Sequence, residues 1–153
     1  MTVAGRVRVL IVCSGNSARS IMAEALFRSI VGDRVDVHSA GIEPGRVHPL
    51  ALALLGESGV ATDGLRSKSV DEYLGQSFDY VITVCDDARA ACPVFPGVAE
   101  SLHWGYPDPA RVEDPDAQAQ AFRRVYADLG VRIHQFLPLA ERFAGARRPV
   151  ELA

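Results

Sequence analysis

The sequence predicts an α/β fold, a three-layer α/β/α arrangement around a four-stranded parallel sheet. The first observation is that short apolar segments alternate with segments of helical period along the 153 residues. Such alternation is typical of a parallel sheet that helices cover on both faces. The second is that the first apolar segment, Val7–Val12, is rich in β-branched residues, as buried parallel strands are.

The predicted elements follow one another without a repeat, a linker or a second domain. Strands are expected at residues 7–12, 35–39, 80–84 and 101–104. Helices are expected from Ser20, from Pro49 to about Ser58, near residues 70–75 and over residues 116–142. In the first helix Glu24 and Arg28 are expected on the polar side, and Pro138 is expected to bend or shorten the last one. The inward face of the last helix is expected to carry Phe122, Val125, Leu129, Ile133 and Phe136.

Length and composition indicate one domain, residues 1–153, with a tail that frays from about residue 144. The net charge of −3 provides no basic surface for nucleic acid or an anionic membrane. The first nine residues lack the apolar region of a signal peptide, and no run of 18 apolar residues occurs, so a cytoplasmic protein is expected. Three cysteines, an odd number, indicate reactive or buried thiols rather than a disulfide framework.

The loop Cys13–Ser20, between the first strand and its helix, has the features of an anion site. Backbone N–H groups converge at the positive end of the helix. Gly15 allows tight curvature, Asn16 tolerates left-handed backbone angles, and the planar guanidinium of Arg19 matches an oxyanion. Cys13 lies where these groups favour its thiolate, although a buried structural cysteine remains the alternative. The expected oxyanion-binding residues are Ser14, Gly15, Asn16, Ser17, Ala18, Arg19 and Ser20.

Three residues with chemically reactive side chains lie at or just after the ends of predicted strands. Cys13 and Cys85 each close a strand, and Asp108 follows the fourth strand. Because the carboxyl ends of parallel strands meet at one edge, this placement favours an enzyme. The histidines lack the spacing of zinc ligands, so neither a metal nor another cofactor is expected. The alternative for the remaining thiols is a buried strand-end Cys85 and an incidental Cys92.

Four separated blocks recur in an order that resembles a known family. The blocks are CSGNSARSIMAEA, SAGIEP, VITVCDDARAACPVFPG and LHWGYPDPA, which span nearly the whole chain. The chain resembles the thioredoxin-coupled arsenate reductases built on the low-molecular-weight tyrosine phosphatase fold. That family usually has two acidic residues in the last block, whereas here the first of these positions is Pro107.

The resemblance implies a relay of three thiols in a monomer. Arsenate, with phosphate or sulfate as a mimic, would bind the loop, Cys13 would attack arsenic, and Asp108 would act as general acid. Cys85 would then form a disulfide with Cys13, and Cys92 would take over to give Cys85–Cys92, which thioredoxin would reduce. Residues 86–97 would have to move. Weak phosphatase activity is compatible with the same loop.

Two other functions stay open at the level of sequence. A tyrosine phosphatase would need only Cys13, Arg19 and Asp108. A non-catalytic oxyanion or redox sensor would use the thiols without turnover.

The single lysine of the chain, Lys68, is a candidate for a structural role beside the anion loop. Fifteen of the sixteen basic residues are arginine. Some members of the resembled family hold potassium beside the loop, with residues that match Asn16, Glu24 and Ser39 together with an aspartate, and Lys68 lies at the position of that aspartate. An ammonium would repel a cation there, but it can itself supply the charge and donate three hydrogen bonds. Lys68 is therefore expected to support the loop, with a solvated surface lysine as the alternative.

Overall fold

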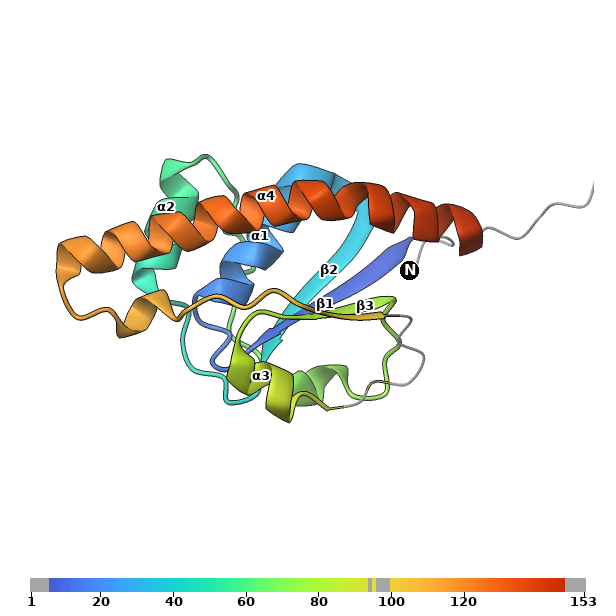
Figure 1. The fold of residues 1–153 in the computed structure, drawn as a ribbon, viewed down its shortest axis with the longest axis horizontal. Coiled ribbons are helices and arrows are strands. Elements are labelled where there is room, and N and C mark those ends of the chain that lie inside the picture. Colours follow the sequence, from blue (N-terminus) through green and yellow to red (C-terminus); the bar gives the residue numbers. More distant parts are fainter. Residues whose placement is uncertain (1–5, 94, 96–99, 148–153) are drawn as a thin grey trace, which may run out of the picture.

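A four-stranded parallel sheet forms the centre of the protein (Figure 1). The computed structural model describes residues 6–93, 95 and 100–147, with side chains up to residue 139. The strands are β1 (Val7–Cys13), β2 (Val35–Gly41), β3 (Tyr80–Thr83) and β4 (Glu100–His103), in the order β2-β1-β3-β4. Val12 pairs with Ala40 of β2 on one side and with Thr83 of β3 on the other.

Helices cover both faces of this sheet, as the sequence predicted. Helices α1 (Arg19–Val31) and α4 (Pro115–Arg147) pack together on one face, with α2 (Pro49–Glu57) beside them, and α3 (Asp86–Ala91) lies on the opposite face (Figure 1). The connection through α1 runs from β1 towards one edge of the sheet, whereas the connection through α3 runs from β3 towards the other edge. Because such crossovers are right-handed, the two helices must lie on opposite faces.

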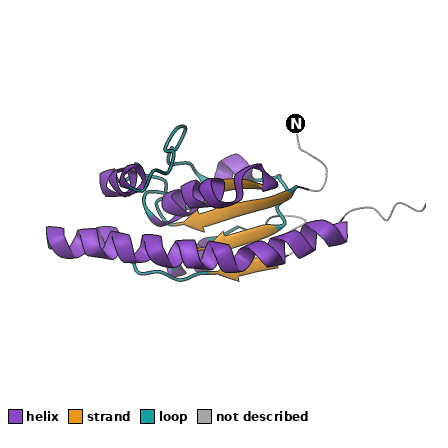
Figure 2. Cartoon of the chain, turned by 90° about the horizontal axis from the view of Figure 1, so that it is seen from above, coloured by secondary structure: helices purple, strands orange, loops and turns teal. Residues whose placement is uncertain are grey.

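The core is built where α4 crosses α1 and the strands. Helix α4 runs alongside the strands (Figure 2), and the five residues predicted for its inward face are all 4% exposed or less. Its Phe136 meets the rings of Phe27, Tyr80 and Trp104 edge-on, with centroid distances of 5.7, 4.9 and 5.9 Å. This cluster fixes Trp104 at the start of the segment that carries Asp108. Within the described part of the chain, no helix combines the length and the apolar character needed to cross a membrane.

The elements depart from the expected boundaries in a few places. β3 ends one residue earlier than predicted, at Thr83, and β4 begins and ends one residue earlier. Helix α4 continues through Pro138 to Arg147, so the proline does not shorten it; residues 148–153, which make up most of the tail expected to fray, lie outside the described part. Pro138 is on the exposed side of the helix, where backbone carbonyls can tilt towards water without disturbing the packed face.

Three short 3₁₀ turns complete the path, at Gly32–Arg34, Val70–Tyr73 and Pro109–Arg111. The second of them falls within the short helix that the sequence predicted near residues 70–75. The third directly follows Asp108, whose carboxylate accepts a hydrogen bond from the backbone N–H of Ala110 at 3.0 Å. Asp108 is thereby held in a defined position at the start of the turn.

Candidate active site

The candidate site lies where the chain leaves two neighbouring strands in opposite directions. Helix α1 follows β1 on one face and α3 follows β3 on the other, and ligands of open parallel sheets bind at the carboxyl ends of two such strands. Cys13 ends β1 and is 2% exposed, while Cys85 lies two residues beyond β3 and is 4% exposed. The Ser14 hydroxyl lies 3.2 Å from the Cys85 sulfur. A second thiol is thus in direct contact with the loop that follows Cys13.

The loop after Cys13 is held open from its outer side. Backbone N–H groups of residues 42–48 donate to its carbonyls: Ile42 to Cys13 at 3.1 Å, Glu43 to Ser14 at 2.8 Å, Gly45 to Gly15 at 3.0 Å and His48 to Ser17 at 2.9 Å. Because the carbonyls of the loop accept hydrogen bonds on its outer side, the N–H groups of the loop can face inwards. The N–H group of Asn16 donates to the Cys13 sulfur at 3.1 Å. Such inward N–H groups form a concavity suited to an anion.

A close approach between β2 and the loop requires glycine at position 41. A Cβ atom at Gly41 would lie 2.8 Å from the backbone nitrogen of Asn16 and 2.9 Å from the Ser14 carbonyl oxygen, so any other residue would displace the loop. Asn16 itself has a φ of +47°, in the left-handed region that asparagine tolerates better than most residues. The block SAGIEP therefore includes the glycine and the segment that shape the anion loop.

Asn16 is fully buried and connects the loop to the structure beneath it. Its side-chain amide donates to the Ser20 hydroxyl at 2.7 Å and to the Ser39 hydroxyl at 2.9 Å, and its side-chain oxygen accepts from the backbone N–H of Lys68 at 2.8 Å. The Ser20 hydroxyl in turn lies 2.8 Å from the Cys13 sulfur. The Cys13 sulfur is thus contacted both by a backbone N–H and by a side-chain hydroxyl.

Arg19 reaches from the start of α1 to the segment that carries Asp108. Its guanidinium donates to the Tyr106 carbonyl at 3.0 Å and lies 3.5 Å from the Asp108 carboxylate. Arg111 approaches the same carboxylate at 3.7 Å. The arginine at the loop and the carboxylate predicted as an acid therefore face each other across the site.

A buried ion-pair cluster lies below the loop. Lys68 is 6% exposed, and its ammonium donates to the Arg66 carbonyl at 2.8 Å and to Glu24 and Ser39 at 3.4 Å each. Ser39 donates in turn to Glu24 at 2.9 Å. Glu24 is 1% exposed, so the expectation that it lies on a polar helix face is wrong: all but the last part of α1 is buried between the sheet and α4. Burial lowers the pKa of Lys68, and the Glu24 carboxylate opposes that shift.

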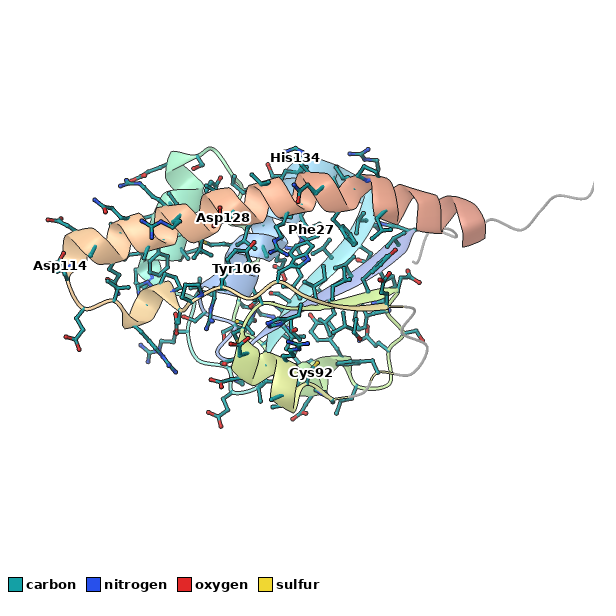
Figure 3. The ribbon with its side chains drawn as sticks, viewed as in Figure 1. Phe27, Cys92, Tyr106, Asp114, Asp128 and His134 are labelled. Atoms are coloured by element: carbon teal, nitrogen blue, oxygen red, sulfur yellow. The ribbon has the colours of Figure 1, made fainter. Side chains whose placement is uncertain are left out.

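Cys92 lies apart from the other two thiols, at the far end of α3. Figure 3 shows it on the side of the sheet opposite α4. Together with Arg89, Phe95 and His103 it lines a cavity of about 410 Å³, and burial raises the pKa of its thiol. None of the three cysteines is in a disulfide. The segment 86–97 that was expected to move includes residues 94, 96 and 97, which lie outside the described part.

Several contacts of the site were not predicted. The Ser14–Cys85 contact and the Tyr106 carbonyl that orients Arg19 depend on loop conformations, which no sequence pattern indicates. The same holds for Ser67, whose hydroxyl donates to the Gly15 carbonyl at 2.9 Å. Among the residues the structure describes, no group of three His, Cys, Asp or Glu side chains is arranged to share a metal ion.

Fold and site together define an α/β protein whose oxyanion loop connects the first strand to the first helix and begins with a cysteine. The chain belongs to the low molecular weight phosphotyrosine protein phosphatase family, which it matches over residues 8–145. That match covers all the candidate site residues, from Cys13 to Asp108.

Similarity to individual proteins points to one branch of this family. The chain is 41% identical to a protein of Halalkalibacterium halodurans named arsenate reductase, over 84% of this chain and 93% of the relative. A solved structure of a thioredoxin-dependent arsenate reductase from Corynebacterium glutamicum superposes with a TM-score of 0.71 at 32% identity, over 91% of this chain and 64% of that one. An arsenate reductase solved in a phosphate-binding state gives a TM-score of 0.70 at 28% identity, over 88% and 98%.

Proposed function

We propose that this protein reduces arsenate to arsenite by a relay of three thiols. The observation that carries the proposal is the contact of a second thiol, Cys85, with the anion loop of the first, Cys13, through Ser14. The names of the similar proteins support the substrate, and the phosphate-binding state of one structural neighbour supports a tetrahedral oxyanion in the loop. Turnover of arsenate by the purified protein with thioredoxin, thioredoxin reductase and NADPH, followed as NADPH consumption, tests it.

The first step uses the groups that converge on the loop. Inward N–H groups and Arg19 bind the arsenate oxygens, and the Cys13 thiolate attacks arsenic. Asp108, 3.5 Å from the Arg19 guanidinium, delivers a proton to the departing oxygen, which leaves as water. The product of this step is a bond between the Cys13 sulfur and arsenic, still in its pentavalent state.

The second step transfers two electrons to arsenic. The Cys85 thiolate attacks the Cys13 sulfur, the sulfur–arsenic bond breaks, and its electron pair stays with arsenic, which leaves as arsenite. The two thiols are thereby oxidised to a Cys13–Cys85 disulfide. Ser14, whose hydroxyl contacts the Cys85 sulfur at 3.2 Å, can donate a hydrogen bond to that thiolate before it attacks.

The third step requires α3 to unwind. Cys85 caps the beginning of α3 and Cys92 caps its end. Seven residues of α-helix span about 10 Å, whereas the Cα atoms of a disulfide lie no more than about 7 Å apart. A helix of six residues is only marginally stable by itself, so unwinding is accessible. Cys92 then attacks Cys85, which frees Cys13 and leaves a Cys85–Cys92 disulfide for thioredoxin.

Cys13 should be the first thiol to react with iodoacetamide at neutral pH. Its sulfur lies in the anion loop at the beginning of α1, where the Asn16 N–H and the Ser20 hydroxyl contact it, and such surroundings are typical of reactive cysteines. Arsenate or phosphate should protect it by occupying the loop. The measurement is mass spectrometry of the alkylated peptides over time. Equal labelling of all three cysteines, with no protection by either oxyanion, would contradict the assignment of Cys13.

The exchange from Cys13–Cys85 to Cys85–Cys92 should accelerate with pH. Burial raises the pKa of Cys92, so its reactive thiolate is scarcer at neutral pH than that of an exposed cysteine. The rate should therefore keep rising above pH about 8.5, the ordinary cysteine value. Rapid acid quench and peptide mapping of the two disulfides measure it. A rate that is flat from pH 7 to 9 would mean that thiolate formation at Cys92 does not limit the step.

A phosphatase is the second candidate, because the family is named for that activity. It would use Cys13, Arg19 and Asp108 alone. In that case Cys85→Ser and Cys92→Ser would both hydrolyse p-nitrophenyl phosphate like the parent, and the parent would not reduce arsenate. Measuring both activities in the parent and the two variants separates the candidates.

A further inference from the structure

We propose that His103 is a positioning residue for the second thiol, Cys85. Its imidazole joins β3 and the edge strand β4 to the first residue of α3, and so keeps Cys85 beside the anion loop. This inference rests on the proposed relay, in which Cys85 must meet first Cys13 and then Cys92.

Both nitrogens of His103 are engaged, on two different elements. Nδ1 lies 2.8 Å from the Thr83 hydroxyl, at the end of β3, and Nε2 lies 2.9 Å from the carboxylate of Asp86, the first residue of α3. The residues thus bridged, Thr83 and Asp86, flank Val84 and Cys85. His103, the last residue of β4, therefore connects the two residues on either side of the segment that carries the thiol. We call this arrangement of Thr83, His103 and Asp86 the bracket.

Asp86 is placed by this contact rather than by burial. Its side chain is 93% exposed, whereas that of His103 is 20% exposed. An exposed carboxylate in the first turn of a helix is stabilised only weakly by the helix itself. The hydrogen bond to a partly buried imidazole, itself fixed by Thr83, adds a directional restraint on the start of α3.

The two ends of α3 differ in the way that the relay requires. At the beginning, the Cys85 sulfur contacts Ser14 and accepts from the Ala88 N–H at 3.3 Å, in addition to the bracket formed by His103. At the end, Cys92 faces the cavity of about 410 Å³. When α3 unwinds, the restrained end stays beside Cys13 and the end at Cys92 has space to move. His103 lines the same cavity.

The packing around the ring also indicates a defined position for it. A Cβ atom at Gly105 would lie 3.0 Å from His103 Nε2, so glycine leaves room for the imidazole in its present orientation. Gly105→Ala should push the ring away from Asp86 without removing any polar group. It is a second, independent way to disturb the same contact.

The test isolates the step that His103 serves. The experiment uses the Cys92→Ser background, with diamide as the oxidant. The Cys13 thiolate adds to the N=N bond of diamide, and the Cys85 thiolate then attacks the Cys13 sulfur and displaces the reduced hydrazine, which forms Cys13–Cys85. His103→Ala should slow this disulfide formation about ten-fold, as expected for loss of a hydrogen bond to a charged group. His103→Gln, which can still donate to Asp86, should recover part of the rate. Peptide mapping under non-reducing conditions measures it.

Matched variants of the first turn separate positioning from helix stability. Asp86→Ala should slow the disulfide as much as His103→Ala does, and the double variant should be no slower than either. Asp87→Ala removes the same charge from the same turn of α3 and should form the disulfide at the parent rate. Cys13 alkylation and its protection by phosphate should be unchanged in every variant, because the anion loop is intact.

Three results would overturn the proposal. The first is formation of the Cys13–Cys85 disulfide in His103→Ala at the same rate as in the parent. The second is an equally slow disulfide formation in Asp86→Ala and Asp87→Ala, which would assign the effect to the charge of the first turn of α3. The third is a loss of Cys13 alkylation that parallels the slower disulfide, which would mean a general structural role. Should His103→Ala fail to fold, the exposed Asp86→Ala and the Gly105→Ala variant decide the question. The diamide reaction needs no arsenate, so a protein that reduces no arsenate but depends on His103 here would refute the relay and not the positioning role.

Discussion

Cys92→Ser should release about one arsenite per enzyme molecule and then stop, because the relay loses its last thiol. The first two steps involve only Cys13 and Cys85, which this substitution does not touch. Cys92 is at the opposite end of α3, so the anion loop and the Ser14–Cys85 contact should be retained. Steady-state NADPH consumption with thioredoxin should fall to the background rate. The expected end state is an enzyme trapped as the Cys13–Cys85 disulfide.

Arsenite should be measured by rapid quench, and the disulfide by non-reducing peptide mapping of the same samples. Cys85→Ser is the matched control, since it should release no arsenite even in the first turnover. Sustained turnover of Cys92→Ser with thioredoxin would mean that Cys92 is not the outer thiol. Release of arsenite by Cys85→Ser would instead show that some other group accepts the Cys13 sulfur.

Much of the fold follows from local patterns in the sequence. The β-branched run of β1 and the period of α4 each reflect burial on a regular element, and both elements are found where the patterns predicted them. The sheet edge that gathers Cys13, Cys85 and Asp108 follows from topology alone, because all parallel strands end on the same side. Boundaries were less accurate, since packing decides whether a helix continues past an exposed proline such as Pro138.

The contacts inside the site could not be predicted in this way. Burial of Glu24 depends on the Lys68 ammonium and the Ser39 hydroxyl, which come from segments far away in the sequence. The bracket of Thr83, His103 and Asp86 joins three elements, and none of these residue types is unusual where it occurs. Such networks are specified by the three-dimensional approach of loops, whereas periodicity reports only which face of an element is buried.

Lys68→Ala should weaken phosphate binding by about ten-fold and lower the free energy of unfolding by up to about 3 kcal/mol. The ammonium and the Glu24 carboxylate are 6% and 2% exposed, so removing one partner leaves the other charge buried. Arg28, which lies 3.1 Å from the second Glu24 oxygen, offsets part of that loss. Ser39 bonds both Glu24 and Asn16, so disorder in the cluster should reach the anion loop.

Thermal unfolding and phosphate titration by calorimetry measure the two effects. Lys68→Met with Glu24→Gln removes both charges, and it should be more stable than Lys68→Ala because no unpaired charge remains buried. Arg66→Ala is the surface control: it breaks an exposed pair with Glu72, which typically contributes less than about 1 kcal/mol. Equal losses in Lys68→Ala and Arg66→Ala would show that the buried pair has no special role.

Potassium should raise the phosphate affinity of the Lys68→Ala variant and should not change the activity of the parent. In the parent, the Lys68 ammonium occupies the point where the Arg66 carbonyl, Glu24 and Ser39 oxygens converge, so replacing potassium with sodium at constant ionic strength should leave arsenate turnover unchanged. In Lys68→Ala the same three oxygens remain and can coordinate a monovalent cation, which prefers oxygen ligands. Potassium should then restore part of the phosphate affinity. Stimulation of the parent by potassium several-fold would show that a cation binds beside Lys68, and that the ammonium does not replace it.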